Sequence, residues 1–252
     1  MIAMERAAVL AQISAVRHGF FGRAGGVSTG EFASLNVSAA IGDDPDLVAQ
    51  NRALVERAVG AGALAILKQV HSSRVAILDQ VPEASTIAAD AAVTATRGIG
   101  LAILTADCTP ILLADPIAGV LGAAHAGWRG AVDGIIGNTV EAMLSLGAKR
   151  EDIRVAYGPT ISGPNYEVGE QFRADFLALH PGGAHHFDTP DNRPPHFDLP
   201  GFVEEQLHAA GIDRVEQVGA CTYAHPDRYF SHRYATHNGT RTGRQIAVIG
   251  MT

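Results

Sequence analysis

Apolar residues recur along the chain in two spacings, and each spacing predicts a different kind of element. Short apolar or alternating runs of strand length lie at 64–70, 75–78, 90–94, 100–105, 110–114, 120–124, 153–157, 214–219 and 244–249. Helical spacing follows Asp44-Pro45, an N-cap with proline at the first helical position, and continues to Gly60. It also lies at 130–146, 170–179 and 201–210.

Strand hairpins alternate with single helices instead of forming strict βαβ units. We therefore expect an α/β (α+β) fold with mixed β-sheets, β-hairpins and flanking helices. Neither an internal repeat nor a linker interrupts the pattern, so we expect one domain over residues 1–252.

Two segments lack a regular apolar period. The glycine-rich stretch 17–28 either brings backbone close to a ligand or is a plain surface loop. Residues 180–198 contain four histidines and several prolines. This composition predicts a long solvated loop. Incidental metal binding by its histidines is the alternative.

The segment 101–130 predicts a hairpin that places two metal-binding side chains together. Asp115-Pro116-Ile117-Ala118-Gly119 has turn composition between two apolar runs. A fold about Pro116 and Ile117 sets Cys108 opposite His125, where Cβ atoms lie about 4.5–5.5 Å apart. Because Pro110 cannot donate to a ladder, we expect its strand to begin late or to lie at an edge.

A third ligand is predicted from the strand 64–70, which leads to His71. One cysteine and two histidines form a three-ligand zinc set that leaves a fourth position for water or substrate. From the residues alone, Cys108 is a metal ligand, a nucleophile paired with His125, or a packed core residue. Cys221 has no such partner in the sequence, and we interpret it as structural.

Arginines beside aromatic residues and glycines suggest a binding surface. Trp128 and Arg129 form either a platform for a planar base and an anion, or a core tryptophan with a solvated arginine. The tail adds Arg233, Arg241 and Arg244 near hydroxyls and glycine, a composition that suits phosphate. Of these, Arg241 is predicted to be a surface charge.

The composition narrows the class of protein. With 47% hydrophobic and 18% charged residues, the chain is typical of soluble globular proteins. A net charge of -7 does not indicate the basic surface that binds nucleic acid or an anionic membrane. We expect no membrane span and no signal peptide. Two cysteines far apart predict no disulfide framework, so a reducing cytoplasm is expected.

Several separate motifs together resemble the YfiH-like family, long called laccase-domain or polyphenol oxidase proteins and later assigned purine nucleoside phosphorylase activity. The resemblance spans about residues 17–250. The motifs are Arg23-Ala24-Gly25-Gly26-Val27-Ser28 with Ser34-Leu35-Asn36, Lys68-Gln69-Val70-His71, Asp90-Ala91-Ala92-Val93-Thr94, Thr105-Ala106-Asp107-Cys108, His125-Ala126-Gly127-Trp128-Arg129-Gly130, Gly158-Pro159 with Tyr166-Glu167-Val168, and Phe230-Ser231-His232-Arg233 with Thr242-Gly243-Arg244.

The resemblance implies a zinc site, with copper possible, at His71, Cys108 and His125. It implies phosphorolysis of adenosine, inosine, guanosine and methylthioadenosine, together with adenosine deamination. The expected partners are a purine nucleoside and phosphate, with no protein partner.

Zinc lowers the pKa of bound water towards about 7, and Asp107 is the nearest carboxylate in the sequence for proton transfer. Asp107 and Arg129 are the expected catalytic residues. Substrate binding is expected at Arg23, Asn36, Gln69, Trp128 and Arg233.

Three other functions remain open. A hydrolase that edits UDP-muramoyl peptides in cell-wall synthesis would use the same metal and arginines. A copper-loaded polyphenol oxidase is disfavoured because the 11 histidines form no His-x-His pair. A non-catalytic nucleotide-binding module with structural zinc is disfavoured because structural sites normally have four protein ligands.

Overall fold

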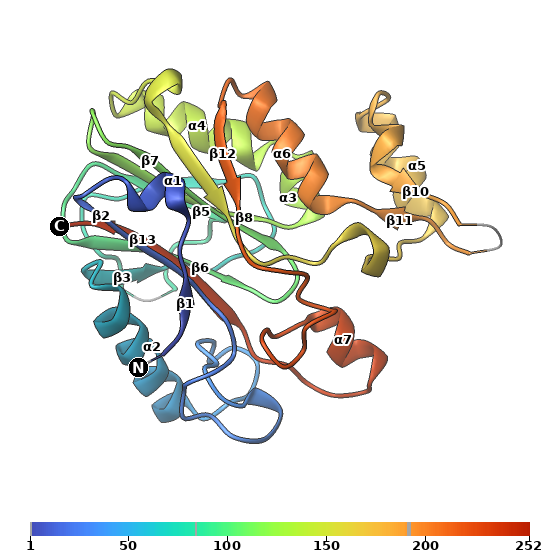
Figure 1. Ribbon diagram of the computed structural model, residues 1–252, viewed down its shortest axis with the longest axis horizontal. Helices are drawn as coiled ribbons and strands as arrows, with labels where there is room; N and C mark the ends of the chain where they lie inside the picture. Colours follow the sequence, from blue (N-terminus) through green and yellow to red (C-terminus); the bar gives the residue numbers. More distant parts are fainter. Residues whose placement is uncertain (1, 84, 191–192) are drawn as a thin grey trace.

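Two β-sheets packed face to face form the centre of the computed structural model, which describes residues 2–83, 85–190 and 193–252 (Figure 1). The five-stranded sheet has the order β1 (Met4–Glu5), β2 (Val16–Phe21), β13 (Gln245–Met251), β6 (Ile99–Thr105) and β3 (Ala63–Ile66). The six-stranded sheet has the order β12 (Arg214–Gln217), β9 (Arg154–Tyr157), β7 (Thr109–Asp115), β8 (Val120–Ala126), β5 (Ala91–Thr94) and β4 (Val75–Ile77).

Both sheets are mixed. Strand pairs β3–β6, β12–β9 and β4–β5 are parallel, whereas the other pairs in these two sheets are antiparallel. The expected α/β (α+β) fold with mixed sheets, hairpins and flanking helices is therefore confirmed.

Helices cover the outer face of each sheet (Figure 1). Helix α2 (Pro45–Val59) packs on the five-stranded sheet. Helices α3 (Trp128–Val132), α4 (Ile135–Ser145), α5 (Glu170–Leu179) and α6 (Leu199–Ala209) belong to the core on the other side. The shorter helices are α1 (Ala8–Ala11) and α7 (His232–His237).

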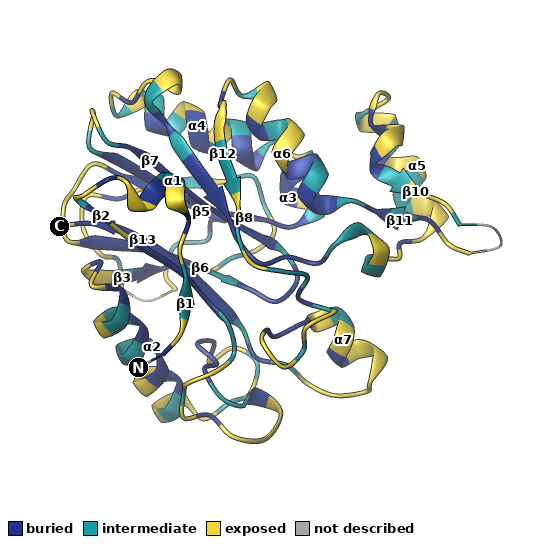
Figure 2. Ribbon diagram, in the orientation of Figure 1, coloured by how far each residue is buried: buried dark blue, intermediate teal, exposed yellow. Residues whose placement is uncertain are grey.

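Successive side chains of the central strands point alternately into the core between the sheets and into a core between one sheet and its helices. In β7, Leu112 faces the other sheet, whereas Leu113 packs towards the helices. In β13, Ile249 faces the space between the sheets and Val248 packs towards α2. Because both faces of these strands are buried (Figure 2), their sequences read as continuous apolar runs.

The ends of α2 follow the sequence signals. The Asp44 carboxylate accepts a hydrogen bond from the Asp46 backbone N–H at 2.8 Å, as an N-cap does. Gly60 ends the helix in the left-handed conformation, with φ of 63°. The helix predicted from Asp44-Pro45 to Gly60 is confirmed.

Three local expectations were wrong. Residues 130–146 form parts of two helices, α3 and α4, because Gly134 has φ of 87° and interrupts the right-handed backbone. The strand before His71 ends at Ile66. The supposed loop 180–198 contains a 3₁₀ turn at Gly183–His186 and a hairpin of β10 (Phe187–Asp188) and β11 (His196–Phe197). Its residues 191–192 lie outside the described residues.

The predicted register of the central hairpin was also wrong. His125 lies opposite Pro110 instead of Cys108, and the strands pair up to Asp115 and Val120. The loop has four residues because the Asp115 carboxylate accepts hydrogen bonds from the backbone N–H groups of Ile117 and Ala118. Cys108 consequently lies just before β7 begins.

Pro110 is placed in an interior strand, contrary to the expected edge or late start. Strand β7 lies between β9 and β8 and begins at Thr109. The Pro110 carbonyl accepts a hydrogen bond from Gly158, one residue beyond the end of β9. The nitrogen of Pro110, which carries no hydrogen, therefore lies beside the end of β9, a position where proline is tolerated.

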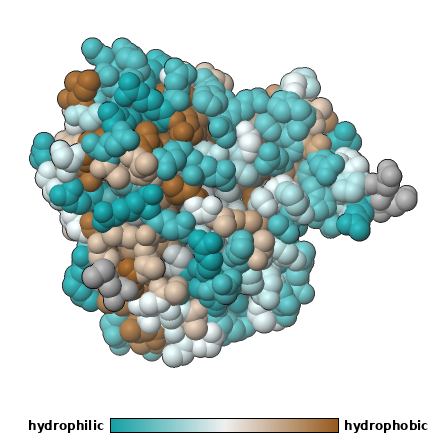
Figure 3. All heavy atoms as spheres, viewed as in Figure 1, coloured by the Kyte–Doolittle hydropathy of each residue, from teal (hydrophilic) through white to brown (hydrophobic). Residues whose placement is uncertain are grey.

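The surface in Figure 3 mixes hydrophilic and apolar residues over the face shown. Among the described residues, no helix combines the length and apolar character that a membrane span requires.

We predict that Leu112→Ala lowers the free energy of unfolding by about 2–5 kcal/mol, because it opens a cavity between the two sheets. Leu112 is 0% exposed. Urea unfolding would measure the change. The control Ile117→Ala, at a position 76% exposed in the hairpin loop, should stay within about 0.5 kcal/mol of the parent. Equal losses in the two variants would contradict the two-sheet core.

Candidate metal centre

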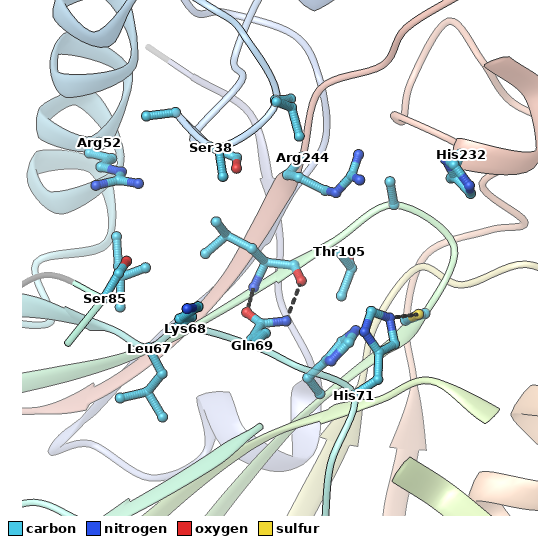
Figure 4. Close-up of a pocket in the computed structure, with 18 residues that line it drawn as sticks. Ser38, Arg52, Leu67, Lys68, Gln69, His71, Ser85, Thr105, His232 and Arg244 are labelled. Carbon is cyan, nitrogen blue, oxygen red and sulfur yellow. Dashed lines mark hydrogen bonds between the residues drawn. The ribbon is translucent and has the colours of Figure 1, made fainter. Parts of the chain in front are cut away.

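Three side chains from separate segments converge at one end of the sheet packing. His71 follows β3, Cys108 lies in the turn between β6 and β7, and His125 is in β8. The Cys108 Sγ lies 3.9 Å from His71 Nε2 (Figure 4). One ligand atom from each of the three residues lies within 4.8 Å of the other two. The trio proposed from the sequence thus forms a single cluster.

Asp90, directly before β5, fixes two members of this cluster. It is 0% exposed, and its Oδ1 lies 2.9 Å from His125 Nδ1. Since a carboxylate accepts, Nδ1 carries the proton and Nε2 is left to bind a metal. The same carboxylate accepts hydrogen bonds from the backbone N–H groups of Val70, His71 and Ser72. These bonds hold His71 at its positive φ of 59°.

The electrostatics favour the ionised forms of Asp90 and Cys108. Burial raises the pKa of Asp90, but hydrogen bonds from His125 and Ser72 outweigh burial and hold the pKa well below its ordinary value. Burial also raises the pKa of the Cys108 thiol, yet the charge and contacts of His125 and His71 lower it to about 6. The thiolate is the form of cysteine that binds metals. Burial lowers the pKa of His125, but the Cys108 thiolate and the Asp90 carboxylate raise it to about 9, so a metal ion at Nε2 would take the place of a proton.

Gly127 gives the cluster its space. A Cβ atom at this position would lie 3.0 Å from Cys108 Sγ and 3.1 Å from His71 Cδ2. Both distances are tighter than ordinary van der Waals contact. The glycine that follows β8 therefore lets the backbone pass directly behind the proposed ligands.

A cavity of about 780 Å³ adjoins the cluster. His71, Cys108 and His125 are among its lining residues. Other residues that line it are Arg52, Lys68, Gln69, Thr105, His232 and Arg244 (Figure 4). The three candidate ligands lie beside a cavity, whereas structural zinc sites are closed by a fourth protein ligand.

Two arginines place positive charge on the cavity wall. Arg52 donates through Nε to the Val37 carbonyl, and Arg244 donates through one terminal nitrogen to the carbonyls of Thr242 and Gly243. Burial lowers the pKa of both guanidinium groups. Within the described residues, neither forms an ion pair with a carboxylate. Such groups favour an anionic ligand.

Gln69 lines the cavity, as expected for a substrate-binding residue, but its amide is occupied. Its Nε2 donates to the Leu104 carbonyl and its Oε1 accepts from the Leu104 N–H, both at 2.8 Å (Figure 4). Gln69 therefore takes the place of a neighbouring strand at the end of β6 and steadies the segment that leads to His71.

Asn36 and Arg23 lie outside the residues that line this cavity. The buried Asn36 carboxamide bonds Ser38, the Asp43 carboxylate and the Arg244 N–H, so it anchors the backbone of Arg244. Arg23 donates to the carbonyls of Ala33 and Pro226. Both side chains hold loops together in this structure.

Asp107 precedes Cys108, but its carboxylate is engaged elsewhere. One oxygen accepts from the Thr222 hydroxyl and the other from the Arg233 backbone N–H, each at 2.6 Å. The residue has a positive φ of 94°, so these bonds fix a sharp turn before Cys108. They also tie this turn to the segment of α7.

Trp128 and Arg233 lie by a second hollow, and Arg129 lies beside Trp128. Trp128 and Arg233 line a space of about 460 Å³ together with Tyr166. The exposed Arg129 lies 5.0 Å above the Trp128 ring, and Arg233 lies 5.3 Å above the Tyr166 ring. These residues form a group of their own, separate from the residues that line the larger cavity.

Sequence reasoning missed the roles of Asp90, Arg52 and Arg244. Asp90 carried a signal, since it is an acidic residue directly before the buried strand β5. Arg244 was noted among the tail arginines but not assigned to the site. Arg52 lies in the middle of α2, where a charged residue ordinarily faces solvent, so nothing in the sequence distinguished it.

The sequence of residues 17–252 matches the model of a family described as multi-copper polyphenol oxidoreductase laccase. The chain belongs to this family. Among related proteins, a Deinococcus radiodurans protein named purine nucleoside phosphorylase is 46% identical over 239 residues, or 94% of this chain and 90% of the relative. A Streptomyces griseus protein with the same activity in its name is 41% identical over 228 residues, covering 89% and 91% of the two chains.

Two solved structures share the fold of this chain. The Bacillus licheniformis hypothetical protein YfiH has a TM-score of 0.90 and 27% identity, covering 100% of this chain and 97% of that chain. A Neisseria meningitidis protein has a TM-score of 0.88 and 31% identity, covering 99% and 98%. The names of the relatives support a function like that of purine nucleoside phosphorylases.

The family description names copper, whereas the site is compatible with more than one metal. Two imidazole nitrogens and a thiolate form a donor set that suits zinc and also binds copper. The donor set therefore fits a metal ion without identifying it.

We predict that Asp90→Asn weakens metal binding by the Cys108 site about 10- to 100-fold, because His125 loses its anionic hydrogen-bond partner. Chelator competition would measure the change, with the thiolate–cobalt(II) absorption band as the signal of this site alone. Ser72→Ala removes one hydroxyl bond to Asp90 and serves as the milder control. Unchanged affinity in a folded Asp90→Asn protein would contradict the orienting role of Asp90.

Proposed function

We propose that the chain is a zinc-dependent purine nucleoside phosphorylase. The observation that carries the proposal is the cluster of His71, Cys108 and His125 beside a cavity lined by Arg52 and Arg244, neither of which forms an ion pair with a described residue. The names of the relatives supply the class of substrate. The proposed substrates are adenosine, inosine, guanosine and methylthioadenosine, each together with phosphate.

His71, Cys108 and His125 would hold the zinc ion, with Asp90 setting the orientation of His125. A zinc ion bound there supplies Lewis acidity, which polarises an oxygen or activates water. The protein contributes the open position, because the three ligands line a cavity large enough for a small molecule.

Phosphorolysis requires phosphate and nucleoside to be held side by side. An oxygen of hydrogen phosphate forms a bond to the ribose C1′ while the bond from C1′ to the purine nitrogen breaks, and the purine leaves with the proton that the hydrogen phosphate gives up. We assign phosphate binding to Arg244 and Arg52, whose free N–H groups provide charge-assisted donors. Fixing both reactants lowers the entropic part of the barrier, and the cationic wall stabilises the anion as it attacks.

Adenosine deamination at the same centre is the second activity that we propose. It needs a proton carrier beside the reacting carbon. Asp107 would serve only after release from Thr222 and Arg233, which now occupy both of its carboxylate oxygens. The arrangement in this structure therefore supports phosphorolysis better than deamination.

We predict that Cys108→Ser removes about one equivalent of metal per chain and lowers phosphorolysis of inosine at least about 100-fold, because the thiolate ligand is lost. Release of hypoxanthine and metal analysis would measure the two effects. Cys221→Ser is the matched control, because Cys221 does not line the cavity, and it should keep both properties. Full phosphorolysis by metal-free Cys108→Ser protein would refute the zinc mechanism.

We predict that Arg244→Gln raises the KM for phosphate about 10- to 100-fold, which corresponds to one lost charge-assisted hydrogen bond. Steady-state kinetics at varied phosphate would measure the change. The control Arg241→Gln removes an arginine that pairs with Glu31 outside this cavity. Equal KM values in the two variants would remove Arg244 from the phosphate site.

The substrate class is tested by offering inosine with phosphate and, in parallel, UDP-muramoyl-serine. We expect phosphate-dependent release of hypoxanthine. Release of L-serine alone would instead favour the editing hydrolase, and tight nucleotide binding without turnover would favour a binding module. Oxidation of a phenol by copper-loaded protein alone would support the polyphenol oxidase.

A further inference from the structure

A second cluster of side chains that could bind a metal lies between the 3₁₀ turn Gly183–His186 and α6. It lies outside the cavity beside Cys108 and outside the hollow beside Trp128. His185 Nε2 lies 2.8 Å from Glu205 Oε2, and His186 Nε2 lies 2.9 Å from the same oxygen. One ligand atom from each residue lies within 4.8 Å of the other two. Two imidazoles and a carboxylate are a common ligand set for zinc.

The hydrogen bonds of His185 determine which of its nitrogens is available. His185 Nδ1 lies 3.0 Å from the Gly182 carbonyl oxygen. A carbonyl only accepts, so Nδ1 carries the proton. In the neutral ring, Nε2 then presents a lone pair to the lone pairs of Glu205 Oε2. This contact is repulsive unless a second proton or a cation lies between the two atoms.

His186 is held in place by packing. It is 5% exposed, and its ring lies 5.3 Å from that of Phe202 and 6.4 Å from that of Phe197. Its carbonyl accepts a hydrogen bond from the Asp198 N–H. An imidazole fixed in this way is a suitable metal ligand.

We propose that His185, His186 and Glu205 bind a second zinc ion, which joins the segment 183–186 to helix α6. Water completes the coordination, because the side chains of His185 and Glu205 are 60% and 48% exposed. Ligands around tetrahedral zinc lie about 3.3 Å apart. The two exposed side chains can move apart by the few tenths of an ångström that this distance requires. The site lies away from the reacting groups, so it stabilises the structure instead of taking part in phosphorolysis.

Metal stoichiometry tests the proposal independently of the reaction. Protein dialysed against buffered free zinc should retain two equivalents per chain. Cys108→Ser should retain one, as should Glu205→Gln and His185→Ala. The combined Cys108→Ser and His185→Ala variant should retain none. His208→Ala is the matched control and should retain two, because His208 lies 3.9 Å from Glu204 on the same helix with no third ligand among the residues that the structure describes.

A second measurement uses thermal unfolding. Zinc should raise the Tm of the Cys108→Ser protein, since a ligand that binds only the folded state stabilises it. The rise should disappear when His185→Ala is added. One equivalent in the parent and none in Cys108→Ser would overturn the second site, as would a second equivalent that survives both Glu205→Gln and His185→Ala. If only the Cys108 site failed to bind zinc, the parent and Cys108→Ser would each retain one equivalent, and Glu205→Gln would retain none. The two proposals can therefore be refuted separately.

Discussion

The hydrogen bonds of the buried Asp90 carboxylate are the interactions on which the proposed metal centre depends. This carboxylate accepts the Nδ1 proton of His125 and three successive backbone N–H groups of the segment 70–72. Two of the three proposed ligands are thereby oriented by a single anion. An anion at 0% exposure is stable only when it is fully hydrogen-bonded. The contacts that stabilise Asp90 are therefore the same contacts that position the ligands.

The packing of two sheets brings this arrangement about. Strand β5 directly follows Asp90 and pairs with β8, which carries His125. The turn between β6 and β7 crosses from one sheet to the other and places Cys108 beside them. Arg244 precedes β13 of the five-stranded sheet, so the cavity is lined both by the three proposed metal ligands and by an arginine.

Much of this could be predicted from local signals in the sequence. Asp44-Pro45 and Gly60 define α2 because capping acts within a few residues. The mixed fold followed from the alternation of hairpins and helices. The trio of His71, Cys108 and His125 was also identified, although the register that suggested it was wrong by two residues. The three proposed ligands converge because Cys108 lies beyond the ladder, in the turn.

Other features depend on contacts distant in the sequence. The side-chain bonds of Asp115 lengthened the hairpin loop and shifted the register. Gly134 divided a continuous helical pattern by its backbone conformation. Arg52 became part of the cavity because α2 packs beside it, and no residue near Arg52 signals this. The roles of Asp107 and Arg129 in the reaction stay predictions, because each lies with partners outside the larger cavity.

Anomalous diffraction at the zinc edge, from crystals of the zinc-loaded protein soaked with inosine and phosphate, tests the central claim most directly. The account predicts a zinc peak bounded by Nε2 of His71, Sγ of Cys108 and Nε2 of His125, with the nucleoside and phosphate in the adjoining cavity. A peak absent from these three atoms, or a nucleoside bound away from this cavity, would contradict it.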